Sequence, residues 1–462
     1  MKSASKSLYS QRAVFAAMGL ALAAGFTPAG AADLGGNCCA DLEERIAELE
    51  ATTARKGNRK VKLEVSGHVN EAMIFWDDGF ESNAGIYTND NSRTRFRFKG
   101  SAKIADDWKA GYMIEIGVRG ASSKRFTQDD VAARADSGLD VRHSYWFIEG
   151  KKYGTVSVGR TGPAAESITE INLAQTKDVA KFSDVEDSGL GIGVRFKNGV
   201  IGTRDNTTQD IFGYRRVIAH SGDQPGEVER GMVVKYDTPA FAGFTATAAW
   251  GGDDYWDVGL KYHGEFGGFK IAGGIAYGQE SSAEAEANFI DDCLAVSAAN
   301  NPDADCKQLG GSLSIMHSET GLYVTGAAGY RKDDNIDDLF DAPSRADDTS
   351  TFYAIEAGIE KKFFDLGKTT IFGQYYDFQG GSNDRTDLSF DNNVTDFNIA
   401  NSDLTMWGGG IVQGIDAAAM SLYVYYRRIE ADVTLVNGAG ADIAHPGIED
   451  LDLVVAGGMI KF

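Results

Sequence analysis

After its first 60 residues, most of the chain alternates apolar with polar or small residues in segments of about ten. In the clearest segment, Arg93, Arg95 and Arg97 alternate with Phe96 and Phe98. Successive side chains of a strand point to opposite faces, so this period of two predicts strands with one polar and one apolar face. Helical periodicity is almost absent from this part of the chain.

Short turns and longer polar stretches separate these segments in alternation, a pattern typical of transmembrane β-barrels. We therefore predict an all-β fold: a 16-stranded antiparallel transmembrane β-barrel, closed so that no strand edge is left unpaired. Residues 161–228 are expected to form an inward third loop, and one more wall hairpin there would make 18 strands. The predicted strands are 61–76, 92–105, 108–119, 140–150, 153–160, 229–237, 243–252, 254–263, 269–279, 309–317, 322–331, 351–362, 369–379, 403–413, 419–431 and 449–462.

The first 31 residues have the three parts of a secretory signal peptide. Three basic residues lie in the first twelve positions, residues 13–26 are apolar or small, and Ala29-Gly30-Ala31 offers a cleavage site. The apolar stretch is short for a membrane anchor. We expect export through a cleaved signal peptide (1–31) and a location in the cell outer membrane.

Residues 32–60 predict a short periplasmic helix and a linker ahead of the barrel domain, 61–462. Leu42, Ile46 and Leu49 are spaced as in a heptad seam, among charged residues. Two heptads are too few for a stable isolated coiled coil. Either copies of the chain associate, with a trimer favoured, or a single amphipathic helix lies against the barrel or in its mouth.

Three features resemble the rhizobial-type general porins of alphaproteobacteria. They are the opening segment 32–60, the motif Gly-Thr-Val-Ser-Val-Gly-Arg at 154–160 before a long loop, and the last strand, which alternates and ends in Phe462. The resemblance implies a trimeric, water-filled barrel that passes small hydrophilic solutes and ions by passive diffusion. Phe462 at the end of an alternating strand also resembles the signal that the barrel-assembly machinery reads.

The same resemblance implies a pore narrowed by acidic residues of the third loop, which face a basic ladder on the wall. Opposed charges across a narrow aqueous gap order water and disfavour apolar solutes. The alternative is that these arginines belong to an ordinary solvated strand face. The phenylalanines on the opposite face argue against this alternative, because they indicate that the polar face points to water inside the barrel. The implied ladder is Arg93, Arg95, Arg97, Lys99, Arg119, Arg142 and Arg160, and the implied acids are Glu166, Glu170, Asp178, Asp184, Glu186 and Asp187.

Composition excludes several other classes of protein. The chain has 45 basic and 67 acidic residues and a net charge of −22, which argues against a nucleic-acid partner. The six histidines have no metal-ligand spacing and no Gly-x-Ser-x-Gly elbow occurs, so we expect no metal, no cofactor and no catalytic site. In an exported protein, Cys293 and Cys306 are expected to form a disulfide that staples one loop, and the alternative is two free thiols. Cys38 and Cys39 could pair between subunits, since a bond between adjacent cysteines is strained, and their state is left open.

Other interpretations remain to be separated. A solute-specific outer-membrane channel would need a binding track such as Tyr423, Tyr425 and Arg427, and saturable conductance would reveal it. An outer-membrane enzyme and a secreted soluble β-protein are less favoured. Aspartate pairs in the loops predict a solvated acidic rim, with divalent-cation bridging to lipopolysaccharide as the alternative. The expected partners are further copies of the chain, outer-membrane lipid and lipopolysaccharide, the barrel-assembly machinery and small hydrophilic solutes.

Overall fold

The chain divides into Met1–Lys60 and a barrel unit, Val61–Phe462. The predicted signal peptide and the predicted N-terminal helix both lie outside the described residues. Among the residues that are described, no helix has the length and apolar character needed to cross a membrane. The computed structural model describes residues 61–129, 137–204, 210–218, 224–252, 254–281, 289–290, 305–334, 347–380, 388–390, 397–437 and 440–462.

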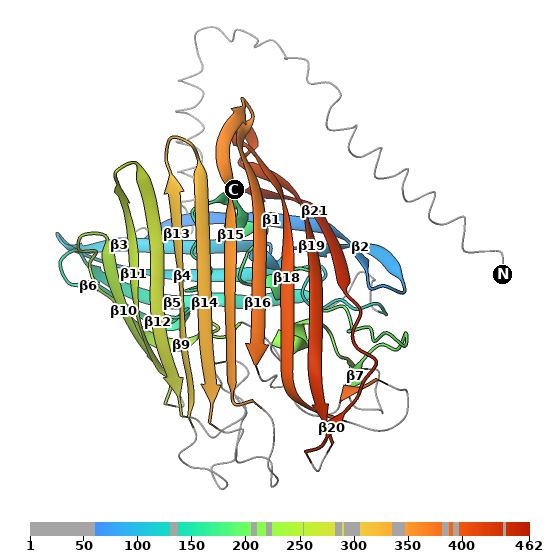
Figure 1. Ribbon diagram of the computed structural model, residues 1–462. Helices are drawn as coiled ribbons and strands as arrows, with labels where there is room; N and C mark the ends of the chain where they lie inside the picture. Colours follow the sequence, from blue (N-terminus) through green and yellow to red (C-terminus); the bar gives the residue numbers. More distant parts are fainter. Residues whose placement is uncertain are drawn as a thin grey trace. The chain divides into compact units, whose positions relative to one another are not determined.

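The barrel wall is a closed antiparallel sheet (Figure 1). Of its 18 described strands, β2 and β20 each pair with one neighbour only. The other 16 pair in chain order until β21 returns to β1, which confirms the predicted 16-stranded barrel. They are β1 (Lys62–Asp77), β3 (Arg95–Ala105), β4 (Trp108–Arg119), β5 (Gly138–Gly150), β6 (Gly154–Thr161), β9 (Gly231–Asp237), β10 (Phe244–Gly251), β11 (Trp256–Phe266), β12 (Phe269–Glu280), β13 (Cys306–His317), β14 (Leu322–Asp333), β15 (Thr349–Phe364), β16 (Gly367–Gly380), β18 (Asn398–Ile415), β19 (Met420–Val436) and β21 (Leu451–Lys461).

Short elements belong to the loops. β7, β8 and β17 form a separate three-stranded sheet, and β2 and β20 extend the wall beside β1 and β19. The bounds are β2 (Ser82–Thr88), β7 (Thr203–Arg204), β8 (Asp210–Ile211), β17 (Leu388–Ser389), β20 (Asp442–Ile443), α3 (Arg215–Ile218) and the 3-10 helices η1 (Asp90–Ser92), η2 (Gln175–Asp178), η3 (Val185–Asp187) and η4 (Asp416–Ala418).

The first and last strands close the barrel. Phe462 and Gly67 exchange two backbone hydrogen bonds, with N···O distances of 2.9 and 3.0 Å. A Cβ added to Gly67 would lie 2.7 Å from the Phe462 ring, so glycine is what lets the terminal ring lie over β1. The closure removes the strand edge whose backbone groups lipid could not satisfy.

The two faces of the wall differ as the alternating pattern predicts. In β5, Val141, Trp146 and Ile148 are exposed on the outer face, whereas Arg142 is buried on the inner face. Outward apolar and inward polar side chains are what a strand needs between lipid and a water-filled interior.

The third loop, residues 162–230, folds back into the barrel. Its first half follows the inner wall, where Leu173 N–H donates to Ser314 Oγ and Gln374 Nε2 donates to the Ala180 carbonyl. Its second half carries α3, which contacts β18 and β19. Leu190 and Ile192 from this half are buried in one apolar cluster with side chains of β19 and β21. The loop therefore covers the inner face of this side of the barrel, and its described residues add no wall strand.

Candidate functional site: a charged constriction

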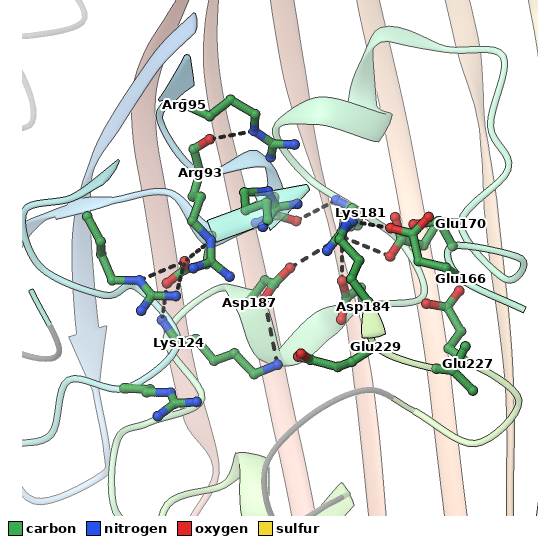
Figure 2. A pocket seen from close by; sticks show the side chains of 18 residues that line it. Arg93, Arg95, Lys124, Glu166, Glu170, Lys181, Asp184, Asp187, Glu227 and Glu229 are labelled. Carbon is green, nitrogen blue, oxygen red and sulfur yellow. Dashed lines mark hydrogen bonds and ion pairs between the residues drawn. The ribbon is translucent and has the colours of Figure 1, made fainter. Parts of the chain in front are cut away.

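A polar cavity of about 90 Å³ lies between the inner face of β3–β5 and the third loop. We call it the constriction. In Figure 2 the labelled Arg93, Arg95 and Lys124 lie on one side, and Glu166 and Glu170 on the other. The lining residues are Asp90, Asn91, Arg93, Arg95, Arg119, Lys124, Arg125, Arg142, Glu166, Ser167, Glu170, Lys181, Asp184, Asp187, Glu227, Val228, Glu229 and Arg230.

One buried carboxylate organises the arginines of the wall. Glu115 of β4 accepts from Arg97 Nε at 2.7 Å, Arg142 Nε at 2.9 Å and Arg95 Nη1 at 3.4 Å. A register shift at Glu115 leaves Arg142 outside the regular pairing of β4 with β5. Such a bulge re-aims a side chain. The result is three neighbouring guanidinium groups that share one carboxylate.

A second carboxylate, Asp90 of η1, pairs with two further arginines of the same wall. It lies 3.2 Å from Arg119 Nη2 and 3.6 Å from Arg93 Nε, and Ser122 Oγ donates to it at 2.7 Å. Arg93 also reaches Asp140 at 2.9 Å. The basic side is thus an ordered array of paired arginines, which fixes the position of each charge.

The loop side of the constriction is acidic but carries its own cations. Lys181 Nζ lies 2.5 Å from Asp184, 2.9 Å from Glu170 and 3.4 Å from Asp187. Arg230 is paired with Glu166. Neither side of the cavity therefore carries charge of one sign alone.

The carboxyl groups of the loop differ in how readily they take up a proton. Burial and the charge of Asp184 raise the pKa of Asp187 to about 7, against the lowering effect of Lys181 and Lys124. Burial also raises the pKa of Glu170 above its ordinary value. Burial would raise the pKa of Glu166 too, but Arg230 and other nearby cations lower it to about 2. The loop side thus combines a permanently ionised group with groups that titrate at higher pH.

Part of the predicted basic ladder lines the constriction. Arg93, Arg95, Arg119 and Arg142 do so. Arg97 lies beside the cavity on Glu115, and the exposed Lys99 is absent from the lining.

Arg160 is misplaced by the prediction. It shares the outer face of β6 with Val156 and Val158, pairs with the exposed Met232 of β9, and donates from Nε to the Val141 carbonyl at 2.9 Å. Its parity along β6 therefore places it outside the barrel rather than in the pore.

The predicted acids divide in a similar way. Glu166, Glu170, Asp184 and Asp187 line the cavity. Asp178 instead binds Lys461 Nζ at 2.7 Å, and Glu186 is buried behind the lining, 3.6 Å from Lys124 Nζ. The prediction missed lining residues that lie in loops, where no strand periodicity marks them: Asp90, Lys124, Arg125, Lys181, Glu227, Glu229 and Arg230.

The predicted aromatic binding track lies under the third loop. Tyr423 OH donates to Asn70 Oδ1 at 2.8 Å, and Tyr425 OH lies 2.8 Å from Ser188 Oγ. Arg427 is fully buried, stacks over the Tyr425 ring and donates to the Lys181 carbonyl. The prediction placed these side chains on the inner face correctly, but the loop covers them and they do not line the constriction.

The remaining candidate chemistry concerns metal ions and cysteines. Within the described ranges, no group of three or more His, Cys, Asp or Glu side chains is arranged to hold a metal ion. Cys306 is buried and disulfide-bonded, but Cys293 lies outside the described residues, so their pairing stays a prediction.

A closed barrel with an apolar exterior and a charged, loop-narrowed interior defines a transmembrane channel. The chain belongs to the Gram-negative porin family, whose sequence profile matches residues 13–444. The protein is an outer-membrane porin channel, and family and fold point to a channel rather than an enzyme.

Comparison with solved structures finds outer-membrane proteins at low sequence identity. OmpF of Salmonella typhi, in complex with daunomycin, is 15% identical with a TM-score of 0.47, over 88% of this chain and 99% of that one. In-vitro folded OmpT of Vibrio cholerae is 12% identical with a TM-score of 0.46, over the same shares of each chain. The DcaP channel of Acinetobacter baumannii is 12% identical with a TM-score of 0.46, again over 88% and 99%. No curated protein sequence matches the chain.

Proposed function

We propose that the channel is a water-filled pore for passive diffusion of small hydrophilic solutes and ions, with the constriction as its narrowest part. The observation that carries this proposal is the cavity itself, in which arginines held on Glu115 and Asp90 face carboxylates of the third loop. The constriction, not a solute-binding track, would select what passes.

The arrangement supports selection by polarity. Charges fixed on opposite sides of a narrow gap orient the water between them, so an apolar solute must displace strongly held water without replacing its interactions. A small polar solute can replace those interactions as it passes. Hydrogen bonds from the wall hold the loop, including Gln374 Nε2 to the Ala180 carbonyl at 2.7 Å, which would keep the opening constant.

The direct test is single-channel conductance of the purified protein in a planar bilayer, together with swelling of proteoliposomes in neutral sugars. We expect stepwise openings and faster swelling with smaller sugars. Folded protein that inserts without conducting would contradict the proposal, and swelling that saturates with one sugar alone would indicate a solute-specific channel instead.

We further propose a homotrimer of the alphaproteobacterial, rhizobial type, exported by cleavage after Ala31, with 32–60 in the periplasm. Polar groups on the outer face of β1 and β6 support the trimer. Glu71 of β1 alternates with the outward Val69 and accepts from Thr94 Oγ1 at 2.9 Å, and Arg160 lies outward on β6. Charged groups are costly against lipid, and a three-fold axis brings different surface patches of adjacent copies together.

The trimer has its own test. The double variant Glu71→Gln/Arg160→Gln should dissociate at a lower temperature on a native gel than the wild-type protein. Lys332→Gln, on the outer face of β14 across the barrel from β1 and β6, is the matched control and should leave the trimer unchanged. Wild-type protein that runs as single copies in mild detergent would contradict the trimer without affecting the pore.

A further inference from the structure

The acidic side of the constriction contains a single lysine that contacts three of its carboxylates. Lys181 Nζ lies 2.5 Å from Asp184, 2.9 Å from Glu170 and 3.4 Å from Asp187 (Figure 2). All four side chains line the same cavity. At these distances an ammonium group cancels a large part of the field of its carboxylates, because little water lies between them.

Both the backbone and the surroundings of Lys181 fix it in place. Its N–H donates to Asn91 Oδ1 at 2.7 Å, and its carbonyl accepts from the buried Arg427 of β19. Its side chain is 13% exposed. Lys177, four residues earlier on the same loop, is exposed and absent from the cavity lining. A comparison of Lys181 with Lys177 therefore distinguishes the effect of a charge fixed at the constriction from the effect of a charge on the loop surface.

The facing wall has an excess of positive charge. Arg95, Arg97 and Arg142 share the single carboxylate of Glu115. Three guanidinium groups on one carboxylate leave a local excess of two positive charges, since arginine stays protonated at any pH at which the protein folds. An acidic side of equal strength would be needed to balance this wall.

Lys181 prevents that balance. Its positive charge reduces the net charge of the group that it forms with three carboxylates from −3 to −2. The raised pKa values of Glu170 and Asp187 mean that these groups are partly protonated near neutral pH, which reduces the negative charge further. Over the whole lining of the cavity, eight cationic side chains face seven carboxylates, so the excess of one positive charge depends on Lys181.

We propose that Lys181 determines the charge selectivity of the constriction and makes the pore pass small anions in preference to cations, although the chain carries a net charge of −22. This inference rests on the proposed pore function. Lys181 would act on the permeating ion by weakening the negative field of the loop carboxylates. The favoured solutes would be small inorganic and organic anions.

The test is the reversal potential of the wild-type pore and of Lys181→Met, measured under a potassium chloride gradient at about pH 8.5, where carboxyl groups are largely ionised. We expect the wild-type pore to favour chloride. Lys181→Met should lower the chloride-to-potassium permeability ratio by about threefold or more, since it removes one charge at contact distance from the path. Lys177→Met is the matched control and should leave the ratio unchanged. Lys181→Arg keeps the positive charge and should have the wild-type ratio.

Two results would overturn the inference: a cation-preferring wild-type pore, or a Lys181→Met pore indistinguishable from Lys177→Met. If Lys181→Met does not assemble, Asp184→Asn decides, because it removes a carboxylate and keeps the lysine. That variant must raise the preference for chloride, and an unchanged ratio contradicts the proposal. A wild-type protein that inserts but conducts no ions would instead contradict the pore function itself.

Discussion

Two parts of the inner wall carry arginines on the same face of the barrel and use them differently. On β3–β5, Arg95 and Arg142 line the constriction and are paired with Glu115. On β19, Arg427 is fully buried and donates to the Lys181 and Val185 carbonyls and to Gln374. The inward direction is common to both, so strand parity alone does not decide the role.

The third loop makes the difference. Along β16–β21 it covers the wall, and inward side chains there become its anchoring points, as Arg427 does. Opposite β3–β5 it stands away, and inward side chains there face the cavity. A polar inner face in a loop-narrowed barrel therefore divides into a lining side and an anchoring side, and each side can be disrupted separately.

The largest effect is expected from disrupting the lining side at Glu115. Glu115→Gln removes the one carboxylate that three arginines share, and leaving buried charges uncompensated costs about 3–5 kcal/mol. On gel electrophoresis of samples heated in detergent, the folded form of Glu115→Gln should disappear at a lower temperature than the folded form of the wild-type protein. Glu149→Gln, whose partner Lys109 lies 2.8 Å away at a half-exposed position, should change stability by less than about 1 kcal/mol. Equal effects of the two variants would contradict the role of Glu115.

On the anchoring side, Arg427→Met should be less costly but should disturb the loop. It leaves the Lys181 and Val185 carbonyls without this donor, at a cost on the order of 3 kcal/mol. We expect noisy, fluctuating single-channel currents, because the segment that carries Lys181 to Asp187 loses an anchor. Arg428→Met, the next residue, points outward to Asp452 and should give quiet currents. A quiet Arg427→Met channel would show that the loop is held without it.

A smaller effect is expected from pH, which should change the loop side and leave the arginine side unaffected. The pKa of Asp187 is raised to about 7 by burial, with Asp184 and Asp90 raising it and Lys181 and Lys124 lowering it. Lowering the pH from about 8 to about 6 should therefore protonate Asp187, remove negative charge and move the reversal potential toward anion preference. Asp187→Asn should flatten this response, and a wild-type potential that is constant across the range would be the contrary result.

Much of the fold could be predicted because a lipid-facing wall imposes its own pattern. The alternation of arginine and phenylalanine in β3 follows from water inside and lipid outside. The same reasoning placed Tyr423, Tyr425 and Arg427 on the inner face. It could not show that the loop covers them, because strand periodicity carries no information on which part of the wall a distant loop contacts.

The errors in the site have two physical sources. Arg160 was taken from the family motif, although its parity with Val156 and Val158 already indicates the outer face. Lys181 and Lys124 were missed because loop residues follow no repeating pattern. Their role depends on contacts between segments far apart in the chain, such as Lys124 with Glu186.

The comparison of Arg95 with an outward arginine tests the central claim most directly. The measurement is the reversal potential under a salt gradient for the wild-type pore, Arg95→Ala and Arg428→Ala. Arg95→Ala leaves Glu115 paired with Arg97 and Arg142, so the wall should stay intact while the pore moves toward cation preference. Arg428→Ala should leave the potential unchanged. If Arg95→Ala behaves like Arg428→Ala, the arginine wall of β3–β5 does not line the path of the ions.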